Sequence, residues 1–204
     1  EIKNIQFYKD LYSLNKQDYT VTSQMKGLFS STQLTPLHYS FLIFWHRIAG
    51  DEDIHYRLFS VFIFILCLPF LFFLAKRLFN SNLAGWIATS LFSVSPMIHL
   101  FSQEARYYIL WAFFIILLNL IFLNLLRAKK RYHSVLYIIT AVLSLYTSVL
   151  SVFVIFGHFL YICFSEKKFI LKFTLFLIII FLFYSPWIYS FYLNREEIVS
   201  AYTW

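Results

Sequence analysis

Glycine, proline, cysteine and charged residues are all scarce in this sequence. Four glycines and four prolines occur in 204 residues, and Asp, Glu, Lys and Arg together make up 13% of the chain. So little glycine leaves no Gly-rich phosphate-binding loop and no flexible linker, which argues against a nucleotide-binding domain. The two cysteines, Cys67 and Cys163, fall inside apolar runs, where buried thiols are expected in place of a disulfide or metal ligands.

Apolar and aromatic residues fill the sequence instead. Hydrophobic residues make up 60% of the chain and aromatic residues 23%, and the mean hydropathy is +0.69. The apolar residues are gathered into runs long enough to cross a bilayer. The composition therefore predicts an integral, multi-pass membrane protein, in which residues 1–204 belong to one all-α bundle of transmembrane helices.

Residues 1–57 lack a run that could span a membrane. Thr35 and Pro36 suit the start of a helix, with Thr as the N-cap and Pro at the first helical position. The apolar run that follows is too short to cross a bilayer, so we expect an interfacial helix at 36–48. The chain begins at Glu1 and not at Met, and we expect both of its ends to be interior points of a longer protein.

About six membrane spans are predicted between residues 58 and 194. The uncharged stretch 134–165 is too long for one ordinary helix, and we expect it to form two short helices that break at the polar residues 146–151. Four other uncharged runs are each long enough for one crossing at about 1.5 Å per residue: 58–75, 81–103, 107–126 and 173–194.

The basic residues favour one orientation of these spans. Nine of the 17 Lys and Arg residues lie in three segments between predicted spans: Lys76, Arg77, Arg127, Lys129, Lys130, Arg131, Lys167, Lys168 and Lys172. Only Glu166 among the ten acidic residues accompanies them. The positive-inside rule makes these segments cytoplasmic, which requires an even number of crossings between Arg131 and Glu166. Residues 1–57 and the segment 103–106 then face the opposite, extracytoplasmic side.

The stretch "FSQEARYYILW" at 101–111 places polar residues between two apolar runs. Gln103, Glu104 and Arg106 form a turn of a few residues before the next span begins at Tyr107. Two helices would hold these charges near the headgroup level, which is a position suited to a lipid phosphate. The alternative is that the three residues only cap the helix ends in a tight turn.

Five motifs occur in a fixed order around this turn: "TPLHY" at 35–39, "RLFS" at 57–60, "AKRLFN" at 75–80, "SP" followed by "QEARYY" between 95 and 108, and "LSLYTS" at 143–148. In order and spacing they resemble the membrane glycosyltransferases of the GT-C class. The resemblance is strongest to the bacterial family-39-like branch that includes protein O-mannosyltransferases and lipid A aminoarabinose transferases, and it covers roughly residues 35–165. The chain departs from that pattern at four positions: Thr35, Phe59, Ile98 and Ser148.

The resemblance implies transfer of a hexosyl or pentosyl group from a polyprenyl-phosphate-linked donor to a lipid, glycan or protein acceptor. It also implies a multi-pass protein of the bacterial inner membrane whose active site is extracytoplasmic. A carboxylate takes the acceptor's proton in such enzymes, and the acidic pair that supplies it follows the first span. Glu1 is the candidate here, with its partner Asp just outside this chain. Asp10 and Asp18 are weaker candidates.

The remaining expected site residues surround the 103–106 turn. Arg106 is expected to contact the donor phosphate, and Glu104 to orient Arg106 or the acceptor. Further substrate- or phosphate-binding positions are Gln103, Tyr107, His38, Tyr39 and Arg57. We expect no metal ion, no cofactor and no nucleic-acid partner.

Two other classes of protein fit the same composition. A polytopic transporter of lipids or glycans is one, but it would be expected to bury charged residues in mid-span, and the predicted spans contain no Asp, Glu, Lys or Arg. A non-catalytic membrane subunit built on the same scaffold is the other. If the protein is a glycosyltransferase, these 204 residues alone are expected to be inactive, because such an enzyme also needs its acidic base and later spans that complete the lipid groove.

Overall fold

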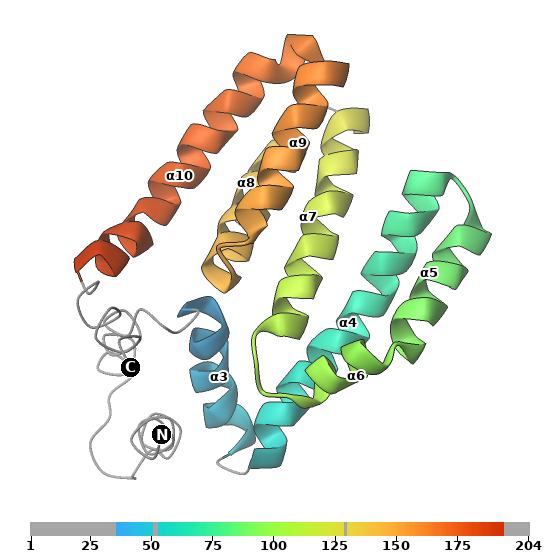
Figure 1. Ribbon diagram of the computed structural model, residues 1–204, viewed down its shortest axis with the longest axis vertical. Helices are drawn as coiled ribbons and strands as arrows, with labels where there is room; N and C mark the ends of the chain where they lie inside the picture. The colour runs from blue at the N-terminus through green and yellow to red at the C-terminus, as the bar shows by residue number, and fades with distance from the viewer. Residues whose placement is uncertain (1–35, 51–52, 129, 194–204) are drawn as a thin grey trace, which may run out of the picture.

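The computed structural model describes residues 36–50, 53–128 and 130–193, and within these ranges every regular element is a helix (Figure 1). The prediction of an all-α protein is therefore confirmed for this part of the chain. The elements, in order, are α3 (Pro36–Ala49), α4 (Asp53–Phe79), α5 (Asn82–Val94), α6 (Pro96–Gln103), α7 (Tyr108–Ala128), α8 (Arg131–Thr147), α9 (Ser151–Ser165), the 3-10 turn η1 (Lys167–Phe169) and α10 (Ile170–Leu193).

Three segments in the described ranges are long and apolar enough to cross a membrane. They are Ile54–Phe79, Tyr108–Arg127 and Lys167–Ser190, and a fourth is added if α5 and α6 together form one span. α8 and α9 have 17 and 15 residues and fall short of the roughly 20 that a perpendicular crossing needs. A membrane protein with three to four spanning helices is therefore supported, and the larger number of six stays a prediction.

The run 81–103 does not form one straight helix. α5 and α6 meet at an angle of 61°. Pro96 is the cause, because proline has no N–H to donate and its ring forces the preceding residue out of the helical region. Ser95 accordingly has an extended backbone, with φ −68° and ψ 120°. The run that was expected to form one crossing therefore forms two helices, α5 and α6. The shorter helix, α6, leads into the 104–107 turn.

The break predicted within 134–165 is confirmed. α8 ends at Thr147 and α9 begins at Ser151, so the interruption lies inside the polar stretch 146–151. The Ser144 hydroxyl donates to Ser151 Oγ at 2.6 Å, and Trp111 Nε1 of α7 donates to the same oxygen at 2.9 Å. These contacts supply hydrogen-bond partners at a turn where apolar surroundings offer few.

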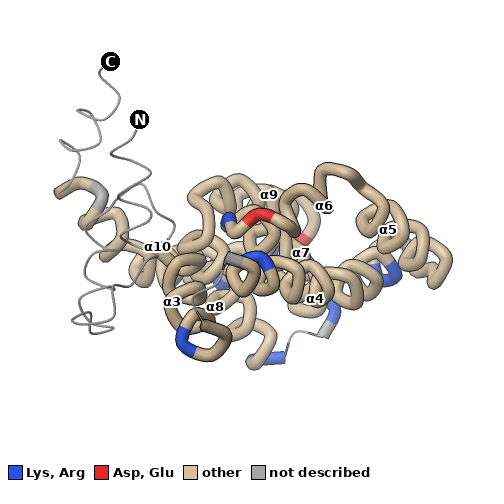
Figure 2. Tube along the Cα trace, turned by 90° about the horizontal axis from the view of Figure 1, so that it is seen from below, with Lys and Arg blue, Asp and Glu red and all other residues tan. Residues whose placement is uncertain are grey.

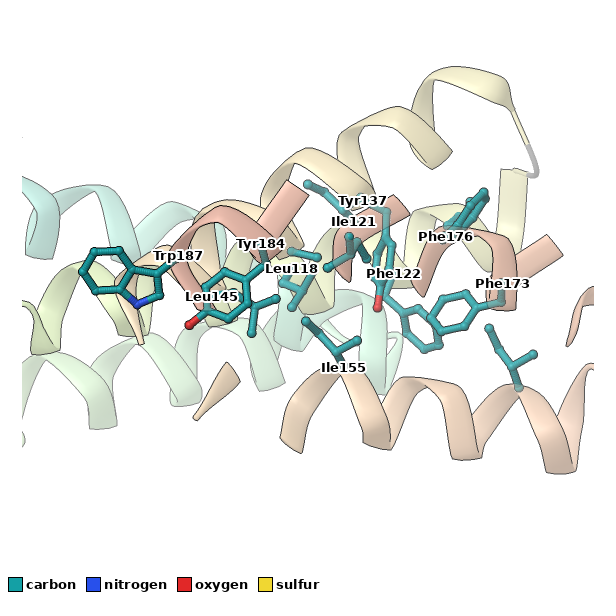
Figure 3. Packing of buried hydrophobic residues seen from close by; sticks show 14 residues of the cluster. Leu118, Ile121, Phe122, Tyr137, Leu145, Ile155, Phe173, Phe176, Tyr184 and Trp187 are labelled. Carbon is teal, nitrogen blue, oxygen red and sulfur yellow. The ribbon is translucent and has the colours of Figure 1, made fainter. Parts of the chain in front are cut away.

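Two hydrophobic clusters share α7. One packs the later residues of α7, including Leu118 and Phe122, against α8, α9 and α10 around the fully buried Tyr137 and Phe173 (Figure 3). The other packs α7 residues from Ile109 to Leu123 against α3 and α4, and Cys67 is fully buried within it. The expectation of a buried thiol is therefore confirmed for Cys67, whereas Cys163 is half-buried; both cysteines are free.

A chain of hydrogen bonds crosses the first of these clusters. His158 Nε2 lies 3.2 Å from Asn119 Oδ1, and the Tyr137 hydroxyl lies 3.0 Å from His158 Nδ1. The Asn119 oxygen can only accept, so the Nε2 hydrogen points to Asn119 and the Tyr137 hydroxyl donates to Nδ1. Phe122 stacks on the imidazole with ring centroids 3.9 Å apart. The three polar side chains thereby join α7, α8 and α9.

The basic turns gather at one end of the bundle. α4, α7 and α9 end there, and α5, α8 and α10 begin there, at the top of Figure 1. Asn80 closes α4 with a φ of 51°, a left-handed conformation that asparagine tolerates, and the Ser81 hydroxyl then caps α5 by accepting from Ala84 N–H at 3.4 Å. The same-end arrangement agrees with the charge argument for a shared cytoplasmic side.

Candidate functional site

The turn between α6 and α7 lies at the opposite end of the bundle from the basic turns (Figure 1). Its backbone is held by side chains from two other helices. Ser60 of α4 donates through its hydroxyl to the Glu104 carbonyl oxygen at 2.8 Å, and His38 of α3 places Nε2 3.4 Å from the Ala105 carbonyl oxygen. Ser60 and His38 are both fully buried. The carbonyl groups of two consecutive turn residues, Glu104 and Ala105, are thus each held by a buried side chain of another helix.

His38 is neutral in this position. A carbonyl can only accept a hydrogen bond, so Nε2 carries the hydrogen, and Nδ1 presents a lone pair that has no hydrogen-bond partner. Burial lowers the pKa of His38 to about 4, against a smaller raising effect of the bond to Ala105. Its ring packs edge-on against Tyr39, with centroids 5.3 Å apart, and at a tilt against Phe59, at 6.1 Å.

The charged side chains of the turn reach the surface. Arg106 Nε lies 3.7 Å from Glu104 Oε2, and the two side chains are 64% and 34% exposed. An ion pair this exposed adds only about 0–1 kcal/mol to stability. The pair is therefore better suited to presenting a guanidinium to a ligand than to holding the helices together. The helices are held together at this turn by the buried hydrogen bonds from Ser60 and His38 to its backbone.

Aromatic side chains pack against one another next to Arg106 in the chain. The rings of Tyr107 and Tyr108 have centroids 4.6 Å apart, and Tyr108 also packs on Phe101 at 4.8 Å. Burial raises the pKa of Tyr107, and the neighbouring phenols of Tyr108 and Tyr39 raise it further, while Arg106 lowers it. A side-chain hydrogen bond with Tyr108 also raises the pKa of Tyr107. Because Tyr39 belongs to α3, its interaction with Tyr107 places α3 next to the turn between α6 and α7.

The structure unites most of the predicted site. Gln103 is exposed at the end of α6, immediately before the turn, and it completes the group: Gln103, Glu104, Arg106, Tyr107, His38 and Tyr39. Arg57 is exposed on α4, one helical turn before Ser60, and no contact joins it to this group in the described residues. Glu1, Asp10 and Asp18 lie outside the described residues.

Several residues that position the site were missed by the sequence analysis. Ser60 stood inside the "RLFS" motif but was not singled out. α3 is fastened to α4 by Trp45, whose Nε1 donates to the His55 carbonyl at 2.8 Å, and by Tyr56, whose hydroxyl lies 2.9 Å from His46 Nδ1. The sequence feature that could have indicated these contacts is the presence of small polar and aromatic residues near the start of a long apolar helix. Their effect is to fix where α3 places His38.

No group of three or more His, Cys, Asp or Glu side chains within the described ranges is arranged to hold a metal ion. The expectation that the protein needs no metal stays a prediction.

Comparisons with protein families, curated proteins and solved structures return no match to this chain.

Proposed function

We propose that the protein is a membrane glycosyltransferase that transfers a sugar from a polyprenyl-phosphate-linked donor to an acceptor on the extracytoplasmic face. The observation that carries the proposal is the Gln103–Tyr107 turn, which presents an exposed Arg106 on a backbone fixed by buried Ser60 and His38. The bonds from α3 and α4 fix where the turn presents Arg106. The motif resemblance gives the reaction class.

Arg106 is assigned to the donor phosphate. As the sugar leaves, negative charge grows on the phosphate oxygens, and a preorganised cation that contacts them lowers the barrier. A guanidinium offers a planar fork that matches two phosphate oxygens. Glu104 faces Arg106 through Nε at 3.7 Å, so the carboxylate orients the guanidinium while the terminal nitrogens remain for the ligand.

The neighbouring side chains are assigned to the sugar and the headgroup. Gln103 and Tyr107 flank the charged residues in the chain, Tyr39 interacts with Tyr107, and their hydrogen-bonding groups suit a polyhydroxylated ligand. Arg57 is assigned to headgroup contact. The general base is a carboxylate, and Glu1 remains its candidate.

The larger arrangement belongs to the same proposal. We place the protein in the bacterial inner membrane with about six spans, counting α8 and α9 as crossings, and with the basic turns in the cytoplasm. The polyprenyl tail of the donor then lies along the exposed apolar faces of the helices. A lipid, glycan or protein hydroxyl approaches the turn from outside.

The test is transfer of radiolabelled sugar from a polyprenyl-phosphate donor by the full-length protein in membranes. Arg106→Ala should lower turnover by about a hundredfold, the scale of a lost transition-state donor. Arg106→Lys should recover part of the rate, since an ammonium keeps the charge but lacks the fork. Glu104→Gln should also slow the reaction. Arg47→Ala, which removes an exposed arginine of α3, is the matched control and should be nearly silent.

Near-normal rates for both Arg106→Ala and Glu104→Gln would show that the charges only cap a turn. Transfer that is absent from the unaltered protein with every polyprenyl-phosphate sugar tried would favour the non-catalytic subunit. Movement of the donor across vesicle membranes without transfer would favour a transporter.

A further inference from the structure

Exposed basic side chains crowd the end of the bundle that lies opposite the Gln103–Tyr107 turn. All eight that the structure describes there are exposed, and together they are called the basic end: Lys76, Arg77, Arg127, Lys130, Arg131, Lys167, Lys168 and Lys172. Glu166 is the only acidic residue in these turns among the described residues. Figure 2 shows how greatly Lys and Arg outnumber Asp and Glu along the traced helices.

Within the basic end, the side chain of Arg127 reaches the backbone of another helical hairpin at Arg77. Arg127 Nη2, at the end of α7, donates to the Arg77 carbonyl oxygen, at the end of α4, across 2.7 Å. This bond occupies one of the five N–H groups of the guanidinium. In the described ranges neither arginine forms an ion pair with an acidic side chain. The Arg127 guanidinium is thus held at the end of α4, where Arg77 adds a second exposed positive charge, and an anion bound there would be attracted by both.

Large exposed apolar side chains occur in the same helical turns and in the adjoining turns as these charges. Leu78 and Phe79 follow Arg77, Trp86 lies in the first turns of α5, and Tyr132 follows Arg131; all four are exposed. Tryptophan and tyrosine commonly mark the headgroup level of a bilayer. The basic end therefore offers cations for a phosphate and, next to them, apolar surface for acyl chains. That combination fits a phospholipid better than a free anion or a nucleic acid.

We propose that the basic end binds an anionic phospholipid, with the headgroup phosphate between Arg77 and Arg127 and the acyl chains against the exposed apolar residues of the α4–α5 hairpin. Clusters of Lys and Arg on the cytoplasmic side of spanning helices attract anionic lipids. The positive-inside rule explains why cations lie on this side, but it does not require that Arg127 be held against the backbone of Arg77 at the end of α4. The site is independent of the glycosyltransferase proposal.

A lipid bound at this position would join the α4–α5 hairpin to α7. A ligand that binds only the packed form stabilises that form in proportion to its occupancy. The contact between α4 and α7 would then be firmer in a membrane rich in anionic lipid than in a neutral one.

The experiment measures lipid selectivity directly. The purified protein is reconstituted into phosphatidylcholine nanodiscs with traces of spin-labelled phosphatidylglycerol or phosphatidylcholine, and the motionally restricted fraction of each label is compared. The unaltered protein should prefer phosphatidylglycerol. Arg127→Gln and Arg77→Gln should each reduce the preference about fivefold, the scale of one basic residue near a membrane surface. Arg127→Lys should show a lipid preference between those of the unaltered protein and Arg127→Gln, because an ammonium keeps the charge but lacks the fork. This variant also provides a test if a glutamine variant fails to fold.

Three outcomes would overturn the proposal. Lys168→Gln removes one charge from a different turn of the basic end, and if it reduces the preference as much as Arg127→Gln, the attraction is diffuse and no site exists. Arg47→Gln, at the other end of the bundle, should have no effect, and a loss there would point to net charge alone. If inorganic phosphate displaces the labelled lipid better than chloride of equal ionic strength, the ligand is a free anion.

Discussion

His38 Nε2 lies 3.4 Å from the carbonyl oxygen of Ala105, although 67 positions separate the two residues in the chain. This contact joins the short helix α3 to the turn that presents Arg106. Ser60 makes the parallel contact from α4 to Glu104. The charged turn is therefore held by residues that carry no charge themselves, and the first predictions concern those residues.

Removing the Ser60 hydroxyl should slow sugar transfer without touching a charged group. Ser60→Ala leaves the Glu104 carbonyl without its 2.8 Å donor, at an expected cost of about 1–3 kcal/mol in unfolding free energy. The turnover of the full-length protein should fall while Arg106 remains in place. The Ser93 hydroxyl bonds only to carbonyls of its own helix, so Ser93→Ala is the control. Equal rates for the two variants would mean that the backbone of the turn does not depend on Ser60.

Acidification should destabilise the fold through His38. The pKa of His38 is about 4 in the folded protein and 6.5 for an ordinary histidine, so the unfolded chain binds more protons between these limits. Stability should therefore be complete above about pH 6.5 and decline as the pH falls toward 4, by about 2 kcal/mol at pH 5. Thermal unfolding in detergent, compared between the unaltered protein and His38→Gln at pH 8 and pH 5, isolates this group. A pH dependence that is the same in both proteins would contradict the assignment.

The close approach of α4 and α5 should not tolerate a larger residue at Gly85. A Cβ added there would lie 2.8 Å from the Phe72 ring and 3.1 Å from the Phe72 carbonyl oxygen. Gly85→Ala should lower the unfolding free energy by about 1–3 kcal/mol, the usual cost of overpacking. Gly157 has no neighbour within 4 Å of its added Cβ, so Gly157→Ala should be neutral or stabilising. Unfolding in a denaturing detergent series measures both, and a more harmful Gly157→Ala would refute the packing argument.

Single cysteines should report the orientation of the bundle. In a variant without Cys67 and Cys163, cysteines at Asn82 and Lys130 should react with an impermeant thiol reagent only from the cytoplasm, and one at Gln103 only from outside. All three positions are exposed, whereas the neighbouring Ser102 is buried and would label poorly. Labelling of the Lys130 and Gln103 cysteines from the same side would contradict the layout and the extracytoplasmic site together.

Local patterns in the sequence predicted the helices better than their bends. The interruption between α8 and α9 was predicted from uncharged length, the parity of crossings and the serine-rich stretch 146–151. The 61° bend between α5 and α6 was not predicted, although Pro96 belongs to one of the motifs. The uncharged run 81–103 has the length of one crossing, and a single helix was therefore expected. Whether a proline kinks a span or divides it depends on the neighbouring helices, and their positions are not encoded within the run.

The site was predicted in part for a similar reason. The 103–106 turn and the start of α3 were each singled out, but nothing local revealed that His38 would reach the Ala105 carbonyl. Ser60 was overlooked because one serine in an apolar helix has no distinctive pattern. Its role follows from tertiary packing of α4 against the turn, and sequence periodicity carries no information on that packing.

α7 contributes residues to both hydrophobic clusters. During membrane insertion the helices on either side of it therefore lack a complete packing partner until α7 has entered the bilayer. A chain cut in the turn near Lys130 would leave α7 with the first fragment and expose the buried faces of α8 and α10 on the second. We expect the second fragment to be degraded when made alone and to be protected when both fragments are made in the same cell.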